Sequence, residues 1–141
     1  MDSAARRLTL PASLDSVVTF RDFVRSGALE AGVPDGELEK LDLVLEEILV
    51  NIARYAYVPE TGATEVAFFP DGPGKLYLEI SDWGNAFNPL EVEPPDFSRG
   101  LADRPVGGLG VFLVRSLVGD IAYRREAGRN VLSFNFPGPG E

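Results

Sequence analysis

A carboxylate and an amide lie one helical turn apart within a long apolar segment. Glu47 and Asn51 are separated by four positions, so on a helix their side chains are neighbours about 40° apart. An amide oxygen can bind magnesium, and a carboxylate can accept a proton as a general base. Glu46 points about 100° away from Glu47, so these two carboxylates do not share a site. The alternative is a solvated helix face with a Glu47–Asn51 hydrogen bond, but a polar group in such apolar surroundings favours a bound partner.

A second group of polar residues follows a predicted strand. The segment reads Asp82-Trp83-Gly84-Asn85-Ala86-Phe87-Asn88-Pro89. A carboxylate at the strand end can accept a hydrogen bond from an exocyclic amine, and Gly84 allows a ligand to approach the backbone closely. Phe87 and Pro89 are expected to wall a cavity. The alternative is an Asx turn that closes the strand, with Phe87 in the ordinary core.

A glycine-rich turn, Gly107-Gly108-Leu109-Gly110, precedes a third apolar segment. Because the first N–H groups of a helix have no intrahelical partner, such a turn can bind phosphate. The Walker pattern G-x-x-x-x-G-K-[ST] does not occur in the chain, and the Rossmann fingerprint fails because Val111-Phe112-Leu113 follow Gly110 and a loop precedes the glycines. A merely flexible start of the helix is the alternative. Taken together, the three groups predict a nucleotide pocket.

The composition restricts the function further. The 141 residues include neither cysteine nor histidine, which excludes disulfides, thiolate zinc sites, histidine metal ligands, a Ser-His-Asp triad and a histidine phosphorelay. A formal net charge of −9 argues against binding to the phosphate backbone of nucleic acids. The sequence has no apolar run of membrane-spanning length and no recognisable signal peptide, so we expect a cytoplasmic protein with no membrane partner.

Hydrophobic periodicity predicts the elements that position these groups. We expect a strand over 6–10, which Pro11 ends, and then a helix from a Ser13 cap to about Ala31. Gly32 is suited to end this helix in a left-handed conformation. The apolar face of the helix is expected to comprise Leu14, Val17, Val18, Phe20, Phe23 and Val24.

The next helix carries Glu47 and Asn51. We expect it over about 35–57, capped by Asp35. Its main apolar stripe comprises Leu38, Leu41, Leu45, Ile48, Leu49, Ile52 and Ala56. Further apolar residues lie on the far side, so we expect burial on two sides, against a sheet and another helix. These far-side residues are Leu43, Val50 and Tyr57.

The second half of the chain alternates like strands. Segments 64–69 and 75–81 are predicted to form a hairpin around Asp71-Gly72-Pro73-Gly74. Residues 84–106 lack periodicity and are too long for a passive connection, so we expect a functional lid there.

The last elements are a helix and a second hairpin. We expect the helix over 107–118 with Gly119 as its C′ residue. Strands over 121–126 and 131–136 then pair across Ala127-Gly128-Arg129-Asn130. The expected fold is one domain over 1–141, with its core over about 6–136. It is a two-layer α/β sandwich, with a mixed, mostly antiparallel sheet and three helices on one face.

The three functional groups occur in the order of a known family. Glu47…Asn51, Asp82-x-Gly84-x-x-Phe87-Asn88-Pro89 and Gly107-Gly108-Leu109-Gly110 resemble the N, G1 and G2 boxes of the GHKL (Bergerat-fold) ATPases. The small size, the helix pair and the segment Arg104-Pro105-Val106-Gly107 make the chain similar to stand-alone anti-sigma-factor serine kinases of the RsbW and SpoIIAB type. The resemblance covers about residues 6–136.

The resemblance implies roles for individual residues. By position, Glu47 would be the general base, Asn51 the magnesium ligand and Asp82 the acceptor for the adenine amine. Gly84 and Asn88 would line the base pocket, and the glycine-rich turn would hold the phosphates. The other nucleotide-binding positions that it implies are Arg54, Phe87, Arg104, Gly107, Gly108, Leu109, Gly110, Val111 and Asn130.

Two positions depart from the family pattern. A histidine common after the N box is replaced by Tyr55, and the threonine usual at the last hairpin is replaced by Asn130. Arg104, in the expected lid, would reach the terminal phosphate.

The implied function is that of an ATP- and magnesium-dependent protein-serine kinase. Its implied substrate is a serine of a STAS-domain anti-anti-sigma protein, its second partner is a sigma factor, and it would form a homodimer. One alternative is an ATP-binding switch of the same fold that binds and activates a partner without kinase activity. Another is an ordinary scaffold or a different nucleotide enzyme. Glu47 favours the kinase, because a nucleotide sensor does not need a base.

Overall fold

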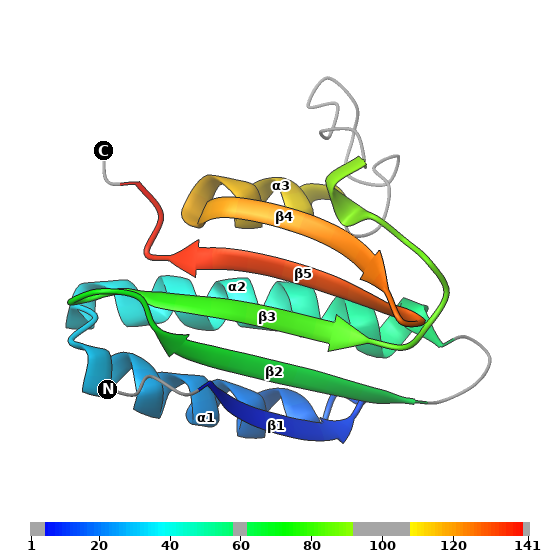
Figure 1. Cartoon of the computed structure of the whole chain (residues 1–141), viewed down its shortest axis with the longest axis horizontal. Helices are drawn as coiled ribbons and strands as arrows, with labels where there is room; N and C mark the ends of the chain where they lie inside the picture. Colours follow the sequence, from blue (N-terminus) through cyan, green and yellow to red (C-terminus); the bar gives the residue numbers. More distant parts are fainter. Residues whose placement is uncertain (1–4, 58–61, 92–107, 140–141) are drawn as a thin grey trace.

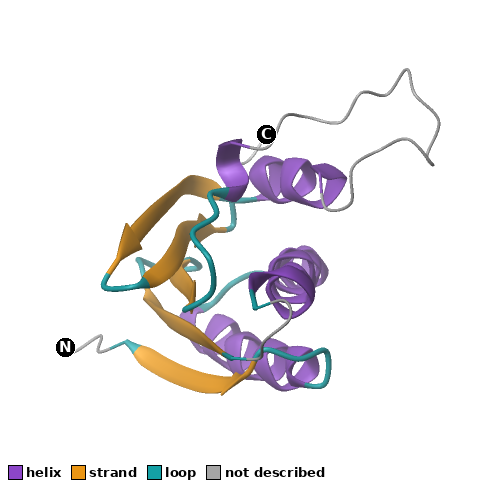
Figure 2. Cartoon of the chain, turned by 90° about the vertical axis from the view of Figure 1, so that its right-hand side faces the viewer, coloured by secondary structure: helices purple, strands orange, loops and turns teal. Residues whose placement is uncertain are grey.

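The computed structural model, which describes residues 5–57, 62–91 and 108–139, has two layers. A five-stranded sheet forms one layer and the helices cover one of its faces (Figures 1 and 2). The strands are β1 (Arg6–Pro11), β2 (Ala63–Pro70), β3 (Leu76–Asp82), β4 (Gly119–Glu126) and β5 (Arg129–Phe136). The helices are α1 (Ser16–Ala31), α2 (Leu38–Asn51) and α3 (Gly108–Leu117), with short helices η1 (Asp35–Glu37), η2 (Ile52–Ala56) and η3 (Pro89–Glu91). The predicted two-layer α/β sandwich is confirmed.

The sheet brings distant parts of the chain together. Its strand order is β1-β2-β3-β5-β4, and each pairing among the described strands is antiparallel. The predicted turn at 71–74 joins β2 to β3, and the Asp71 N–H donates to Lys75 O over 3.0 Å. Because β5 lies beside β3, Asp82 at the end of β3 is directly opposite Asn130 at the start of β5.

The core lies between the sheet and the helices. α2 is the central helix and contacts both α1 and α3. Alternate residues of the inner strands point toward the helices, as the period of a strand requires. The largest fully buried side chains include Phe20, Leu41, Leu45, Phe68, Leu76, Leu78, Phe134 and Phe136.

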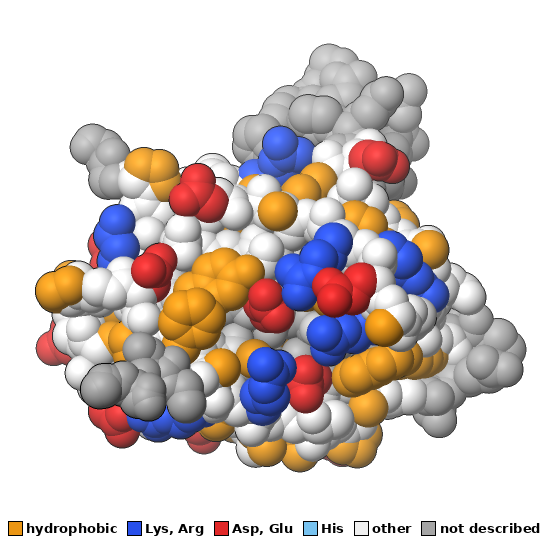
Figure 3. Space-filling view, in the orientation of Figure 1, with side chains coloured by type: hydrophobic (Ala, Val, Ile, Leu, Met, Phe, Trp, Pro, Cys, Tyr) orange, Lys and Arg blue, Asp and Glu red, His pale blue; other side chains and the backbone are white. Residues whose placement is uncertain are grey.

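The outer face of the sheet is covered by its own side chains. Figure 3 shows basic and acidic groups intermixed across this face. The Glu65 Oε1 lies 3.5 Å from the Arg7 Nη1 and 3.7 Å from the Arg129 Nη1, so these ion pairs connect strands β1, β2 and β5. The smaller residues beneath these long side chains are buried, among them Ala67, Ser81 and Ser133.

The first helix differs from its prediction at its start. α1 begins at Ser16, and Ser13 does not cap it but forms a preceding turn, in which its carbonyl accepts the Ser16 N–H over 3.1 Å. Leu14 and Val18 are 52% and 51% exposed, so they do not belong to the buried face. Leu14 precedes the helix, and Val18 lies about 100° around it from Val17. Gly32 ends the helix with φ 85°, as predicted.

The second helix consists of three pieces rather than one. Asp35 starts the 3₁₀ turn η1 without a side-chain cap, α2 follows, and the chain then widens into the π-helix η2. Of the residues expected on the far side of this helix, Leu43 is 36% exposed and so is not buried, whereas Val50 is partly buried against the core. Contacts with both α1 and α3 agree with burial on more than one side. α1 and α3 flank α2 and leave part of its outer surface open.

The final hairpin is tighter than predicted. Gly119 opens β4 and does not act as the C′ residue; the left-handed residue after α3 is Asp120, with φ 51°. The turn consists of Ala127 and Gly128, both with positive φ, 54° and 77°. A two-residue turn of this kind matches the twist of the strands. As a result, Asn130 lies within β5 and not in the turn.

The expected lid lies partly within the description. Residues 84–91 form a turn and the short helix η3, and the remainder of the segment lies outside the described residues. Among the helices that are described, none is long and apolar enough to cross a membrane.

Gly27 provides a test of the packing between α1 and the sheet. A Cβ at this position would lie 2.0 Å from the Phe68 ring, which is buried and packs against Phe23. Gly27→Ala should therefore lower the free energy of unfolding by about 1–3 kcal/mol, although alanine favours helices. Urea denaturation measures this. Gly36→Ala is the control, because a Cβ there meets nothing within 4 Å. Equal stability of the two variants would contradict the packing.

Candidate functional site

A cavity of about 450 Å³ lies between the end of α2 and the sheet. Its walls are mostly apolar, and its amide and carboxylate groups come from Asn51, Asp82, Asn85 and Asn130. The full lining is Ile48, Asn51, Ile52, Tyr55, Ala56, Ile80, Asp82, Asn85, Ala86, Phe87, Pro89, Tyr123, Asn130 and Leu132. The volume and the few polar groups in an apolar lining are typical of small-molecule sites.

Asp82 is the buried carboxylate of this cavity, with 6% of its surface exposed. Its Oδ1 accepts hydrogen bonds from the Gly84 N–H over 2.9 Å and from the Asn130 Nδ2 over 3.0 Å. No described residue donates to its Oδ2. An ionised carboxylate only accepts hydrogen bonds, and its burial is costly unless it is paired. The second oxygen therefore suits a ligand that offers an N–H.

Asn130 orients this carboxylate. Its Nδ2 also donates to the Asn85 carbonyl over 2.9 Å, so both amide hydrogens are used within the protein. Its Oδ1 accepts from the Phe87 N–H at 3.2 Å, the Tyr123 hydroxyl at 2.6 Å and the Arg125 Nη1 at 3.2 Å. This geometry makes Asn130 a support for Asp82, with no donor left for a ligand.

Asn51 closes α2 and faces the other part of the cavity. Helix α2 ends at Asn51, and the π-helix η2 starts at the next residue. The cavity is lined by Ile48, Asn51, Ile52 and Tyr55, which share one face of this helical stretch. π-Helical turns occur frequently at functional sites. Asn51 and Asp82, predicted from separate motifs, therefore line one cavity.

Other predicted site residues lie at its margin. Glu47 is half-buried beside Asn51 but does not line the cavity, and Arg54 is exposed outside it. The Asn88 Oδ1 accepts the Leu90 N–H over 2.9 Å and so closes the turn into η3. A Cβ on Gly84 would lie 2.2 Å from the Ala56 carbonyl oxygen, so glycine is required there by the approach of the helix end. Phe87 lines the cavity and is largely exposed.

The glycine-rich segment is only partly described. Gly108, Leu109, Gly110 and Val111 form the first turn of α3, whereas Arg104 and Gly107 lie outside the described residues. α3 begins at the end of the sheet where β3 ends and β5 begins (Figure 1). α3 is tied to η3 by the Arg115 Nη1, which donates to the Leu90 carbonyl over 3.0 Å.

Sequence reasoning misses the groups that support the site. Tyr123 and Arg125 project from β4 toward Asn130, and the Arg125 Nη1 also donates to the Gly84 carbonyl over 2.8 Å. Their alternation along a strand is a usable signal only if the register of β4 against β5 is known. The π-helix has no signal in the apolar pattern, which continues through it unchanged.

Three comparisons place this architecture among known proteins. The family model described as the histidine kinase-like ATPase domain matches residues 10–136. Serine-protein kinase RsbW of Bacillus mycoides (strain KBAB4) is 26% identical over 131 residues, covering 89% of this chain and 80% of that protein. Serine-protein kinase RsbW of Bacillus cereus (strain AH187) is 28% identical with the same coverage.

A solved structure shows the same fold. The crystal structure of the RsbU and RsbW domains of Rv1364c from Mycobacterium tuberculosis matches 99% of this chain with a TM-score of 0.61 and 18% sequence identity. This chain spans 35% of that longer one. Since the family model covers nearly the whole chain, the chain belongs to the histidine kinase-like ATPase domain family, and within it is similar to RsbW-type serine-protein kinases.

Proposed function

We propose that this protein is an ATP-binding anti-sigma factor that transfers the γ-phosphate of ATP to a serine of a STAS-domain anti-anti-sigma protein. The observation that supports nucleotide binding is the environment of Asp82, which lines an apolar cavity. One of its oxygens accepts hydrogen bonds from Asn130 and Gly84, and no described residue donates to the other. The similarity to RsbW serine-protein kinases supports the reaction. A sigma factor as second partner and a homodimer belong to the same proposal.

The cavity suits adenine. Ile48, Ile80 and Leu132 provide apolar walls for a flat base. The Asp82 carboxylate would accept a hydrogen bond from the exocyclic amine of adenine, whereas the O6 of guanine would face it repulsively. The remaining predicted base-pocket residues, Gly84, Phe87 and Asn88, belong to the turn around this carboxylate.

The other end of the site suits phosphates with magnesium. The described residues contain no group of three or more acidic, histidine or cysteine side chains able to cage a metal. Magnesium nevertheless prefers few protein ligands and keeps waters and phosphate oxygens, so the Asn51 amide oxygen fits as its ligand. When bound, the ion would neutralise charge on the phosphates. The N–H groups at the start of α3, at Gly108, Leu109, Gly110 and Val111, with Gly107 and Arg104 before them, would hold the phosphates.

Glu47 would act as the general base. It would accept the proton of the seryl hydroxyl as the serine oxygen bonds to the γ-phosphorus and the bond between the γ-phosphorus and the leaving ADP oxygen breaks. Its position beside Asn51, outside the cavity lining, leaves the base pocket to other residues. The same position favours the second candidate function, an ATP-binding switch without kinase activity, if the substrate serine does not reach Glu47. Arg54, which is exposed on η2, would also contact the nucleotide.

Asp82→Asn should change nucleotide preference. Asparagine keeps an oxygen for Asn130 and Gly84 but presents an N–H donor to the base, which opposes the adenine amine and suits guanine O6. ATP affinity should fall by about 10–100-fold while GTP affinity rises. Competition against a fluorescent nucleotide measures both. Asp71→Asn, in the exposed turn between β2 and β3, should leave both unchanged. An unaltered ATP-to-GTP ratio in Asp82→Asn would reject Asp82 as the base reader.

Asn51→Ala tests the proposed magnesium contact separately from recognition of the base. Because the amide is proposed to act through magnesium, its removal should weaken ATP binding by about 10-fold or more with magnesium and by less than about threefold in EDTA. Calorimetric titrations under the two conditions provide this comparison. Equal losses with and without the ion would show that Asn51 contacts the nucleotide without it.

Glu47→Gln should reduce phosphoryl transfer without reducing nucleotide binding. Glutamine keeps the shape but accepts the proton poorly, so phosphoryl transfer should fall by about 10²–10⁴ while nucleotide affinity stays within a few fold. Single-turnover transfer from labelled ATP to a STAS-domain substrate measures the first effect. Glu46→Gln, one position away on the exposed side, should retain transfer. Full activity of Glu47→Gln would remove the general-base role, and no transfer by the unaltered protein would favour the switch.

A further inference from the structure

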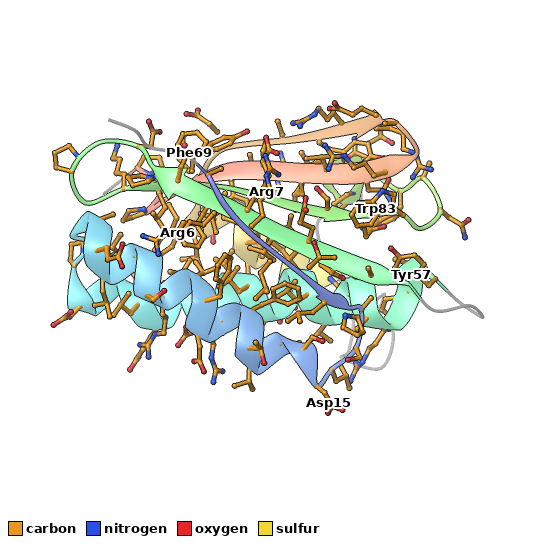
Figure 4. The ribbon with its side chains drawn as sticks, turned by 60° about the horizontal axis from the view of Figure 1, so that its bottom comes forward. Arg6, Arg7, Asp15, Tyr57, Phe69 and Trp83 are labelled. Atoms are coloured by element: carbon orange, nitrogen blue, oxygen red, sulfur yellow. The ribbon has the colours of Figure 1, made fainter. Side chains whose placement is uncertain are left out.

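Tyr57 lies where three separate segments of the chain meet. It follows the last residue of η2, and its hydroxyl donates to the Ala63 carbonyl at the start of β2 over 2.5 Å. The same hydroxyl accepts the Trp83 N–H over 2.7 Å. Tyr57 and Trp83 lie together at one end of the sheet (Figure 4). One oxygen atom therefore joins the helix end, β2 and the turn that follows Asp82.

Backbone contacts strengthen this junction. The Ala56 carbonyl accepts the Asn85 N–H over 3.2 Å, and the chain at Gly84 approaches this carbonyl so closely that any Cβ would overlap it. Gly62 leaves the corresponding space for the Tyr57 ring, since a Cβ there would lie 2.1 Å from the ring. Two glycines thus permit the contact that the tyrosine hydroxyl fixes.

The tyrosine also stays in the form that can donate. Burial raises the pKa of the Tyr57 hydroxyl, the hydrogen bond from Trp83 lowers it in part, and the charge of Asp82 raises it again. The net direction is upward, so the hydroxyl keeps its proton at neutral pH and continues to donate to Ala63.

The junction connects the two ends of the candidate site. Trp83 directly follows Asp82, and η2 directly follows Asn51. We propose that Tyr57 is a positioning residue that holds the Asp82 turn at a fixed place relative to Asn51. One nucleotide can then place its base at Asp82 and its phosphates at Asn51 at the same time. This inference rests on the proposed nucleotide function. Tyr57 does not line the cavity, so it acts through the segments that it joins.

Tyr57→Phe tests this positioning role because it removes only the hydroxyl. Tyr77→Phe is a matched control: its hydroxyl donates to the Glu79 Oε2 over 3.0 Å, and Tyr77 lies near the opposite end of β3. Binding of magnesium-ATP and magnesium-GTP is measured for both variants and the unaltered protein, with melting curves alongside.

In Tyr57→Phe we expect ATP affinity to fall by about 3–10-fold, the usual effect of one lost hydrogen bond. GTP binding, which gains no hydrogen bond from Asp82, should fall less, so the ratio of ATP affinity to GTP affinity falls. Tyr77→Phe should keep the ratio of the unaltered protein.

An unchanged ratio in a folded Tyr57→Phe protein would overturn the inference. Equal losses of affinity for ATP and GTP, or failure of the variant to fold, would also overturn it. The hydroxyl would then stabilise the fold and not the relative placement of Asp82 and Asn51. Absence of ATP binding by the unaltered protein is a different result, since it would refute the nucleotide site itself.

Discussion

The buried carboxylate of Asp82 requires hydrogen-bond donors, and this requirement organises the end of the sheet. Transfer of an ionised carboxylate out of water costs several kcal/mol unless hydrogen bonds replace the lost water. Asp82 receives two of these bonds at one oxygen, from Gly84 and Asn130. Asn130 is itself held by the Tyr123 hydroxyl and Arg125, so the support extends into β4. The remaining oxygen receives no hydrogen bond from a described residue, which is why we propose that it recognises the base.

This constraint also fixes the register of the central strands. Asp82 and Asn130 are direct partners across the antiparallel pair of β3 and β5. A slip of one residue would turn Asn130 to the outer face and carry Val131 under the helices. The core and the site therefore depend on the same register, since Leu78, Ile80, Leu132 and Phe134 follow from the same alternation.

Local patterns in the sequence were sufficient for most of the fold. The turn at 71–74, the left-handed Gly32 and the alternating strands are short-range features, and they lie where the sequence predicts them. The sequence also indicated that Asn51 and Asp82 line one site, but only because three motifs occur in a recognisable order.

The remaining features depend on long-range contacts. Asn130 was expected in a turn, because an alanine gives no sign that it adopts positive φ, as Ala127 does. The helix widens after Asn51 and ends where Ala56 approaches Gly84, a residue far from it in sequence. The supporting roles of Tyr57 and Arg125 arise in the same way, from partners on other elements.

The proposed roles of the residues along α2 follow from the faces of the helix on which they lie. Ile48 and Asn51 face the cavity, while Glu47 lies beside them on the flank. Nucleotide binding and proton transfer would then use different faces of this helical stretch, so a chain could lose its kinase activity and still bind ATP. This is the physical difference between the kinase and the switch.

In the proposed complex, an adenine nucleotide occupies the cavity with its base against Asp82. Titration of isotopically labelled protein with ADP and magnesium, followed by two-dimensional NMR, reports where the base lies. We expect the largest chemical-shift changes at the backbone N–H groups of Gly84 and Phe87 and at the side-chain amide of Asn130. Saturable changes confined to the outer face of the sheet, or no changes at millimolar ADP, would contradict this placement.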